Sequence, residues 1–373
     1  MIRLKPNQYA QVAPLFAQMG EWNVYVTAVL HQTSPGRVYV DNLDAPQSGF
    51  LVSIDRSYLV GNPRNAAFNA ALRDELHATL LAGDRVNPAD PELVLSVASP
   101  QWEPALADML GDWHWPPIWG RNQHFTFGQP QLNWQTALPA GYTIARLDAN
   151  LLQAQGKNLP QTIADSIRIG WQNEANFLQH GFGFVALHGE EIACWCLADA
   201  TVADRCEIGI ETAVSHRNRG LATAVTAATV EFCQNNGFRH IGWHCEANNY
   251  ASSRTAEKVG FVQERAYSDY TFVYDEPRHY AELGRFFFKA QLYEEAADML
   301  EIAIETDEAP PAYVYFLTAR AMAHLQEPVA IEYLQEAVAA GFKDWQLLQT
   351  LPEFAPYRDD PAFPAPGVDT LNE

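Results

Sequence analysis

The stretch from Ile208 to Ala224 constrains this chain most, because an apolar run leads through a glycine-containing turn into a helical pattern. Such a turn leaves the first amide N–H groups of the helix unpaired, and the helix dipole adds partial positive charge beside them. Gly220 lets an anion approach the backbone because it has no Cβ, and Ala222 is small for the same reason. The stretch therefore predicts a site for the pyrophosphate of a nucleotide or of CoA.

Side chains of the turn support the same prediction. Arg217 and Arg219 place positive charge beside the expected anion, and Thr223 offers a hydroxyl group. The alternative is an ordinary strand-to-helix loop with two solvated arginines, since short glycine motifs often occur without this function. The residues of the turn alone leave both interpretations open.

The elements around the turn alternate between strands and helices. Two apolar runs, 181–187 and 192–198, flank a His188-Gly189 turn and predict a hairpin. The later pattern predicts strands over 206–214, 240–245 and 261–274, and helices over 220–235 and 250–259. This alternation is typical of an α/β domain.

Two motifs in this region resemble those of the GNAT acetyltransferases. Arg217-x-x-Gly220-x-Ala222 is similar to the pyrophosphate loop of that family, and Asn249-x-x-Ser252 with Ala256 to Phe261 is similar to its later helix and closing Gly-Phe. Trp243-His244-Cys245 resembles a zwittermicin-resistance-like subgroup. The resemblance covers 141–274 and implies an α+β GNAT fold, with a mixed sheet flanked by helices.

The resemblance also implies acetyl-CoA as the co-substrate and an amine as the acceptor. In such a fold two parallel strands, here 206–214 and 240–245, splay apart around the pantetheine arm, and a backbone amide of the first strand stabilises the oxyanion. The residues that this resemblance places at the cofactor are Ile210, Thr212, Val214, Arg217, Asn218, Arg219, Gly220, Leu221, Ala222, Thr223, Asn249 and Ser252.

Catalysis by direct attack needs a group that takes a proton from the acceptor amine. Glu207 and Glu211 are the candidates on the first strand; they share parity, but a bulge between them would turn them to opposite faces. His244 and Glu246 are alternatives on the neighbouring strand. Each of these residues could instead be an ordinary solvent-facing strand residue.

A proton donor for the leaving thiolate is less evident. Many family members carry a tyrosine where this chain has Ala256, so Tyr250, Tyr267 or Tyr270 would have to replace it, or no acid is needed. Asn249 is expected either to contact the CoA arm or an ordered water, or to cap the helix that follows it, or to do both.

The five cysteines indicate neither a disulfide framework nor a metal site. They contain no C-x-x-C pair, and we expect them to be small buried residues in a reducing compartment rather than nucleophiles. They are Cys194, Cys196, Cys206, Cys233 and Cys245. We expect no metal, because the reaction does not need one.

Three domains are expected, with boundaries at 1–138, 139–276 and 277–373. The first segment reads as strands over 37–42 and 49–60, a helix with Phe68, Leu72, Leu76 and Leu80 on one face, and further strands and helices. This order suggests a tandem arrangement in which a degenerate GNAT-like half walls the acceptor cleft. Its turn, Gly61 to Arg64, lacks the pyrophosphate motif. The alternative is that the first segment is an α/β accessory domain unrelated to the GNAT fold.

Tryptophans also cluster in and after the first segment. They are expected to pack in a core or a domain interface, and an aromatic pocket is the alternative. These residues are Trp113, Trp115, Trp119 and Trp134.

The last segment contains an internal repeat. Leu283, Ala296, Leu300 and Ala303 recur 34 residues later as Leu317, Ala330, Leu334 and Ala337. This period resembles tetratricopeptide helix pairs and predicts a small all-α domain, although Thr318 stands where the first unit has Gly284. Such a domain could bind a protein partner or pack on the catalytic domain.

Charge narrows the range of partners. The net charge of -21 argues against nucleic acid and anionic membranes, and it suits amine acceptors, although solubility alone would explain it. No apolar run is long enough to span a bilayer, and Arg3, Lys5 and Pro6 interrupt any signal peptide, so we expect a cytoplasmic protein. The alternatives to an enzyme are an acyl-CoA sensor that signals through the repeats, and a scaffold.

Overall fold

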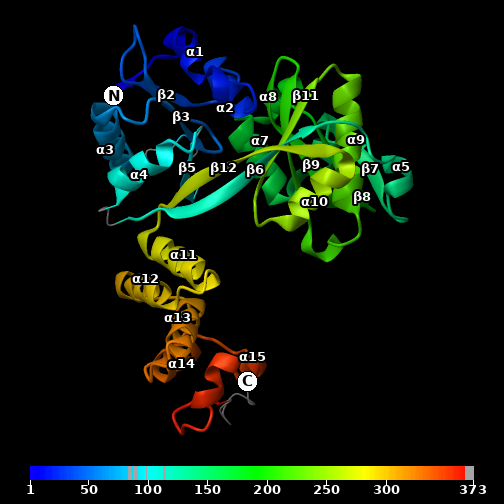
Figure 1. Cartoon of the computed structure of the whole chain (residues 1–373). Coiled ribbons are helices and arrows are strands. Elements are labelled where there is room, and N and C mark those ends of the chain that lie inside the picture. The colour runs from blue at the N-terminus through cyan, green and yellow to red at the C-terminus, as the bar shows by residue number, and fades with distance from the viewer. Residues whose placement is uncertain (83–85, 87–90, 98, 112–114, 366–373) are drawn as a thin grey trace. The chain divides into compact units, whose positions relative to one another are not determined.

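The computed structural model describes all residues except 83–85, 87–90, 98, 112–114 and 366–373 (Figure 1). Its contacts divide the chain into two compact units, one of residues 1–113 with 119–271 and one of residues 114–118 with 272–373. Within the described residues, no helix is both long enough and apolar enough to cross a membrane.

The first unit is built on one mixed sheet. Its strands are β1 (Ile2–Arg3), β2 (Arg37–Val40), β3 (Ser48–Val52), β4 (Ser57–Gly61), β5 (Glu92–Val97), β6 (Ile118–Phe127), β7 (Thr143–Arg146), β8 (Gly183–His188), β9 (Glu191–Val202), β10 (Arg205–Thr212), β11 (His240–Glu246) and β12 (Phe261–Val273). They lie in the order β1-β2-β3-β4-β5-β12-β6-β11-β10-β9-β8-β7. Strand pairs β4–β5 and β10–β11 are parallel, as the family resemblance requires of β10 and β11.

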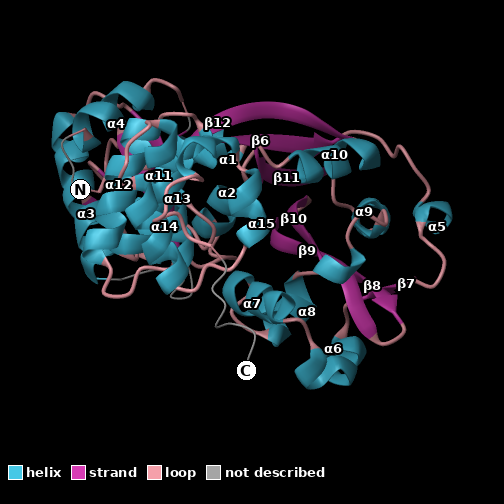
Figure 2. Ribbon diagram, turned by 90° about the horizontal axis from the view of Figure 1, so that it is seen from below, coloured by secondary structure: helices cyan, strands magenta, loops and turns pink. Residues whose placement is uncertain are grey.

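Helices cover both faces of this sheet. We call the elements from β1 to β6 the first half of this unit and the elements from α5 to β12 the second half. The helices of the first half are α1 (Tyr9–Gly20), α2 (Val24–Leu30), α3 (Ala66–Ala82) and α4 (Trp102–Leu110). The helices of the second half are α5 (Trp134–Ala137), α6 (Ala149–Gln155), α7 (Gln161–Gly170), α8 (Glu174–His180), α9 (Leu221–Asn235) and α10 (Tyr250–Val259). Figure 2 shows α9 on one side of strands β8 to β10, and α7 and α8 on the other side. The predicted fold class, a mixed sheet flanked by helices, is confirmed.

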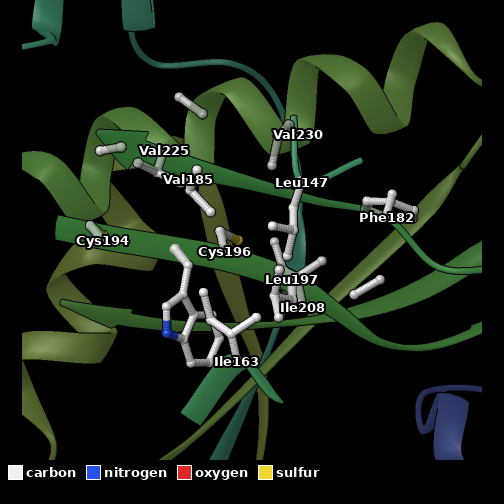
Figure 3. Packing of buried hydrophobic residues seen from close by; sticks show 14 of the residues in the cluster. Leu147, Ile163, Phe182, Val185, Cys194, Cys196, Leu197, Ile208, Val225 and Val230 are labelled. Carbon is white, nitrogen blue, oxygen red and sulfur yellow. The ribbon is translucent and has the colours of Figure 1, made fainter. Parts of the chain in front are cut away.

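The core of the second half lies on both sides of these strands. Val225 and Val230 of α9 pack against one face, and Ile163 of α7 packs against the other (Figure 3). Cys194 and Cys196 lie in the sheet between them, and all five cysteines are free and buried, as predicted. Because these apolar side chains are packed on both faces of the sheet, they hold β8, β9 and β10 in register.

The two halves exchange strands. Strand β6 comes from the first half of the unit, yet it pairs with β11 of the second half; β12 comes from the second half, yet it lies beside β5 of the first. Figure 1 shows β6 and β12 side by side between the halves. The two halves therefore share one continuous sheet, and side chains of β6 lie next to those of β11.

Several predicted elements have different bounds. The strand expected over 49–60 is a hairpin of β3 and β4, because Ser53 Oγ accepts hydrogen bonds from the amides of Asp55 and Arg56 and turns the chain. Helix α2 was not predicted: its β-branched residues favour a strand, but Asn23 caps it by accepting from Val26 N–H. Phe68, Leu72 and Leu76 share the buried face of α3, whereas the side chain of Leu80 lies outside the described residues.

The second unit is helical, as predicted. It contains α11 (Glu276–Lys289), α12 (Tyr293–Thr306), α13 (Ala312–His324), α14 (Ala330–Ala339) and α15 (Trp345–Thr350). Gly284 leaves room for Leu300, since a Cβ there would lie 2.5 Å from Leu300 Cγ, while its counterpart Thr318 is buried and bonds Val314 O. The repeat thus corresponds to two helix pairs, and its tetratricopeptide character stays a prediction.

Candidate functional site

The turn before α9 leaves backbone donors open. Gly220 is the N-cap in the left-handed conformation, with φ +80°, and no side chain caps the helix. In the part of the chain that the structure describes, the amides of Leu221, Ala222 and Thr223 have no hydrogen-bond acceptor, and the first helical bond is Ala224 N–H to Gly220 O. These amides lie at the positive end of the helix dipole and suit an anion.

Arginines lie around these amides in an exposed turn. Arg217 Nε donates to Thr212 O at 3.1 Å, and Arg219 Nη2 donates to Ser215 O at 3.3 Å, so both side chains fold back on the turn. Asn218 adopts a φ of +62°, which reverses the chain before Gly220. The three residues are exposed, so their polar groups remain available to a ligand.

The turn before α3 in the first half has side-chain acceptors of its own. There Asn62 Oδ1 accepts from Arg64 N–H at 3.0 Å, and Asn65 Oδ1 accepts from Phe68 N–H at 3.2 Å. A side chain thus occupies the third amide of α3, whereas the corresponding amide of α9, that of Thr223, is open. This difference agrees with the missing pyrophosphate motif at Gly61 to Arg64.

Strands β10 and β11 splay apart. They pair only between 205–207 and 240–242, whereas β10 continues along β9 to Thr212 and β11 continues along β6 to Glu246. Residues 208–212 and 243–246 therefore face each other without a ladder between them. The strand predicted over 206–214 ends at Thr212, and Val214 lies exposed in a 3-10 turn.

The predicted cofactor residues lie on β10, in the turn, in the first turn of α9 and at the start of α10. Ile210 and Thr212 lie half-buried on β10, Leu221 is buried, and Ala222 and Thr223 are half-buried in the first turn of α9. Asn249 caps α10 by accepting from Ser252 N–H at 3.1 Å, as one of the two interpretations predicted. Ser252 Oγ accepts from Trp243 Nε1 at 3.0 Å, which ties α10 to β11.

Glu207 lies at the last paired position of β10 before the two strands separate, which we call the apex of the splay. Its side chain is 2% exposed, and Gly242 on the neighbouring strand leaves the space that its carboxylate fills. Glu207 Oε1 lies 3.3 Å from His244 Nε2, but neither oxygen of Glu207 has a hydrogen-bond partner among the described residues. Burial raises the pKa of Glu207 well above its usual value, and Asp199 and Asp55 raise it further.

A bulge does lie between Glu207 and Glu211 in the β9–β10 ladder, but it does not turn the two side chains to opposite faces. The register does shift between Glu207 and Ile208, but their partners on β9 are Ala200 and Ala198, so the extra residue is Asp199 of β9. Because β10 itself has no inserted residue, Glu207 and Glu211 alternate regularly and face the same side. Glu211 is half-buried nearer the turn, and Glu246 is exposed.

Two histidines surround the Glu207 carboxylate. His244 and His124 are cross-strand partners on β11 and β6, and their ring centroids are 4.6 Å apart. His244 Nδ1 lies 2.9 Å from Tyr267 Oη, and His124 Nδ1 lies 3.0 Å from Glu264 Oε2. Both Nε2 atoms are buried and lack a partner among the described residues.

Burial governs the charge of both rings. It lowers the pKa of His124 to about 4 even though Glu264 opposes the shift, and it lowers the pKa of His244 well below its usual value, with His124 and Arg56 contributing. Both imidazoles are therefore neutral at neutral pH. A neutral imidazole with an unpaired nitrogen can accept a proton.

Of the tyrosines considered as proton donors, only Tyr267 contacts this cluster of Glu207, His124 and His244. Ala256 is buried in α10, and Tyr250 is 72% exposed. Burial raises the pKa of Tyr270 to about 12, and Glu103 raises it further. Tyr267 bonds His244 and accepts a long contact of 3.5 Å from Arg56.

Sequence reasoning missed His124, Trp22 and Tyr25. Trp22 and Tyr25 come from the α1–α2 region, and the Trp22 ring lies 5.4 Å from that of His124 and 5.9 Å from that of His244. No motif marks these residues. His124 lies on β6, which the strand exchange brings beside β11.

Among the residues that the structure describes, two groups of histidine and glutamate side chains bring possible metal-ligand atoms within 4.8 Å of one another. One is His124, Glu207 and His244; the other is His188, Glu191 and His216. In the second group Tyr142 Oη lies 2.8 Å from His216 Nδ1, and Glu191 Oε1 lies 3.3 Å from its Nε2, the same separation as that between Glu207 Oε1 and His244 Nε2. The two groups differ in burial, because His124 and Glu207 are buried, whereas His188 and Glu191 are exposed.

Three of the four tryptophans considered for an aromatic pocket belong to the described residues. Trp115 is buried and tilted against His279 in the helical unit, Trp119 is 42% exposed, and Trp134 donates to Glu231 of α9. Trp113 lies outside the described residues.

Comparison with known proteins agrees with this geometry. A family model described as GNAT acetyltransferase matches residues 13–270. The uncharacterized N-acetyltransferase YdfB of Bacillus subtilis (strain 168) is 26% identical over 253 residues, which cover 67% of this chain and 89% of that protein.

Solved structures share the fold. A GCN5-related N-acetyltransferase-like protein from Streptococcus suis 89/1591 superposes with a TM-score of 0.53 at 22% identity, covering 71% of this chain and 98% of its own. A tandem GNAT protein from the clavulanic acid biosynthesis pathway gives 0.50 at 14% identity, covering 74% and 98%. The family model spans both halves of the sheet, and the chain therefore belongs to the GNAT acetyltransferase family.

Proposed function

We propose that this protein transfers an acetyl group from acetyl-CoA to a primary amine by direct attack, without a covalent enzyme intermediate. The observation that carries this proposal is the splay of β10 from β11 directly before an uncapped helix α9. The open amides of Leu221, Ala222 and Thr223 would bind the diphosphate, with Arg217 and Arg219 beside it. Residues 208–212 would hold the pantetheine arm through backbone groups that no other strand uses.

Glu207 is the better of the two predicted bases. It lies at the apex of the splay, where the ladder between the strands ends, and its buried carboxylate makes no hydrogen bond within the described part of the chain, with His244 Nε2 3.3 Å from Oε1. Its raised pKa would fall when a cationic amine binds beside it, because an opposite charge favours the carboxylate. Glu211 lies on the same face nearer solvent and would guide the amine inward.

The first half is proposed to have no CoA site of its own. Asn62 and Asn65 already accept from the amides of Arg64 and Phe68, and the turn from Gly61 to Arg64 lacks the R-x-x-G-x-G/A motif. This half instead covers the acceptor side of β10 and β11 with α2. The subgroup suggested by Trp243 to Cys245 stays a prediction.

Titration calorimetry of the full chain with acetyl-CoA tests the cofactor site. Gly220→Asp places a carboxylate at the diphosphate, and we expect it to weaken binding at least about tenfold through charge repulsion. Gly237→Asp is the matched control, because Gly237 has a φ of +86° and open space around it at the other end of α9. Both variants carry the same backbone strain, so equal affinities would contradict the site.

Thiol release with a panel of amines tests the transfer itself. We expect wild-type protein to release free CoA only when an amine is present, and the acetylated amine to appear in equal amount. Binding of acetyl-CoA without turnover on any amine would instead favour an acyl-CoA sensor.

A further inference from the structure

The strand exchange places a residue of the first half at the centre of the candidate site. His124 lies on β6, and its cross-strand partner on β11 is His244, which contacts Glu207. The amide backbone of β6 is paired along β11 from Asn122 to Thr126, so the position of His124 is fixed by a regular ladder. A GNAT half with its own last strand beside β11 would not have this side chain.

Four buried polar atoms belong to this cluster, and one pair of them, Glu207 Oε1 and His244 Nε2, is 3.3 Å apart. Among the described residues, both oxygens of Glu207 and the Nε2 atoms of His124 and His244 are buried and make no hydrogen bond. A buried unpaired polar atom costs about 1–3 kcal/mol. A cluster of four such atoms in a closed core is therefore unfavourable unless a ligand group binds between them.

Glu264 determines which nitrogen of His124 is free. Burial raises the pKa of Glu264, but Arg265 and His124 lower it below its usual value, so this carboxylate is ionised and accepts hydrogen bonds. The neutral His124 ring must then donate from Nδ1 across the 3.0 Å contact, which leaves Nε2 as a bare acceptor. One ring nitrogen of His124 lies within 4.8 Å of a ring nitrogen of His244 and of a carboxylate oxygen of Glu207.

We propose that His124 is a catalytic residue that the first half contributes through β6, and that its Nε2, with Glu207 and His244, holds the nitrogen of the acceptor amine and takes its proton. This inference rests on the acetyl transfer proposed above. Glu264 is a positioning residue, because it acts through the tautomer of His124.

The proton balance is simple. An acceptor arriving as R–NH3+ gives one proton to the cluster, and its free lone pair forms the N–C bond to the acetyl carbon as the C–S bond breaks. A second proton leaves the nitrogen and protonates the thiolate. The products are the N-acetylated amine and CoA–SH, and the proton held by the cluster returns to solvent.

The surroundings indicate the class of acceptor. Trp22 and Tyr25 cover the two histidines, and Asp199 and Asp55 lie near enough to raise the pKa of Glu207. Aromatic faces and carboxylates both favour a cation. The expected acceptor is therefore a compact, unhindered primary ammonium group rather than a carboxylate-bearing or neutral substrate.

The experiment compares His124→Asn with wild type in the full chain. Asparagine can keep a donor near the position of Nδ1, opposite Glu264, but it has nothing at Nε2 and accepts no proton. We expect kcat/KM for the amine to fall at least about a hundredfold, while the affinity for acetyl-CoA stays within threefold. His124→Gln, which places an amide near the Nε2 position, should lose as much activity.

His240→Gln is the matched control, because His240 is exposed at the start of β11. It should behave as wild type. Melting curves establish that each variant is folded.

The pH dependence separates catalysis from a structural role. His124 is faced by Glu264 and Arg265 of β12, His244 of β11, and Glu207 and Arg205 of β10, while Trp22 of the α1–α2 turn is uncharged. Because Glu264 raises the pKa of His124, Glu264→Gln should move the acid limb of kcat/KM to lower pH. A purely structural contact would leave that limb in place.

The outcomes are distinct. If wild type acetylates amines and His124→Asn keeps its rate and pH profile within threefold, the role of His124 is wrong and acetyl transfer stands. If wild type binds acetyl-CoA but acetylates no amine, both proposals fall. One equivalent of a divalent metal in purified wild type, lost in His124→Asn, would make the cluster a metal site and overturn the inference.

Discussion

Gly242 of β11 makes room for the carboxylate of Glu207 on β10, and a Cβ at Gly242 would collide with both of its oxygens. This relationship exists only at the last paired position before the strands separate. Gly242→Ala should therefore push Glu207 out of the apex. We expect a loss of about 1–3 kcal/mol in the free energy of unfolding, from overpacking, and a fall in turnover.

Gly120→Ala is the control for this change. Gly120 lies on β6, and a Cβ there would meet no atom within 4 Å. Its free energy of unfolding should stay within about 0.5 kcal/mol of wild type, as judged by urea denaturation. Equal stability and activity of the two variants would show that Glu207 has freedom to move at the apex.

The sequence predicted the local form of the turn before α9 better than the arrangement of the candidate catalytic residues. The uncapped helix start from Arg217 to Ala222 depends on local conformation, so its signal is contiguous in the sequence. Glu207 was among the candidates because it lies on the same strand. The choice between Glu207 and Glu211 depended on a bulge that belongs to β9, which local patterning of β10 does not reveal.

His124 could not be found in this way. Its role depends on β6 lying beside β11 rather than within the first half, and strand order is decided by packing over the whole sheet. Hydrophobic periodicity predicts which segments form strands, but not which of them become neighbours. Helix α2 shows the same limit, since the Asn23 cap and burial of the helix outweigh its β-branched composition.

Asp199 should make stability depend on pH. Burial and the neighbouring Asp55 raise its pKa to about 7, above the unfolded value, so the folded protein binds a proton that the unfolded chain releases. Its contribution is present at low pH and is lost as pH rises through 7. Asp199→Asn should therefore gain stability over wild type between pH 5 and 8, on the order of 2 kcal/mol.

Urea unfolding of wild type and Asp199→Asn at several pH values measures this gain. Asp74→Asn serves as the control, because Asp74 is exposed on α3 and should show no such trend. A gain that shrinks as pH rises would reverse the sign of the shift and contradict a protonated Asp199.

The cysteines should be inert in the folded protein. Burial raises the pKa of Cys194 to about 12, and it also raises those of Cys196, Cys206 and Cys245, so few thiolates exist at pH 8. Since the thiolate is the reacting form, a disulfide reagent should label these four thiols roughly a thousandfold or more slowly than an exposed cysteine. Ala251→Cys, at an exposed position on α10, supplies that reference within the same protein.

Unfolding in urea should release all five native thiols together, because all are buried and free. The Cys194→Ala variant should still transfer acetyl groups, since direct attack by the amine needs no thiol. If one native cysteine were labelled rapidly and activity fell in proportion, the result would indicate a covalent intermediate instead.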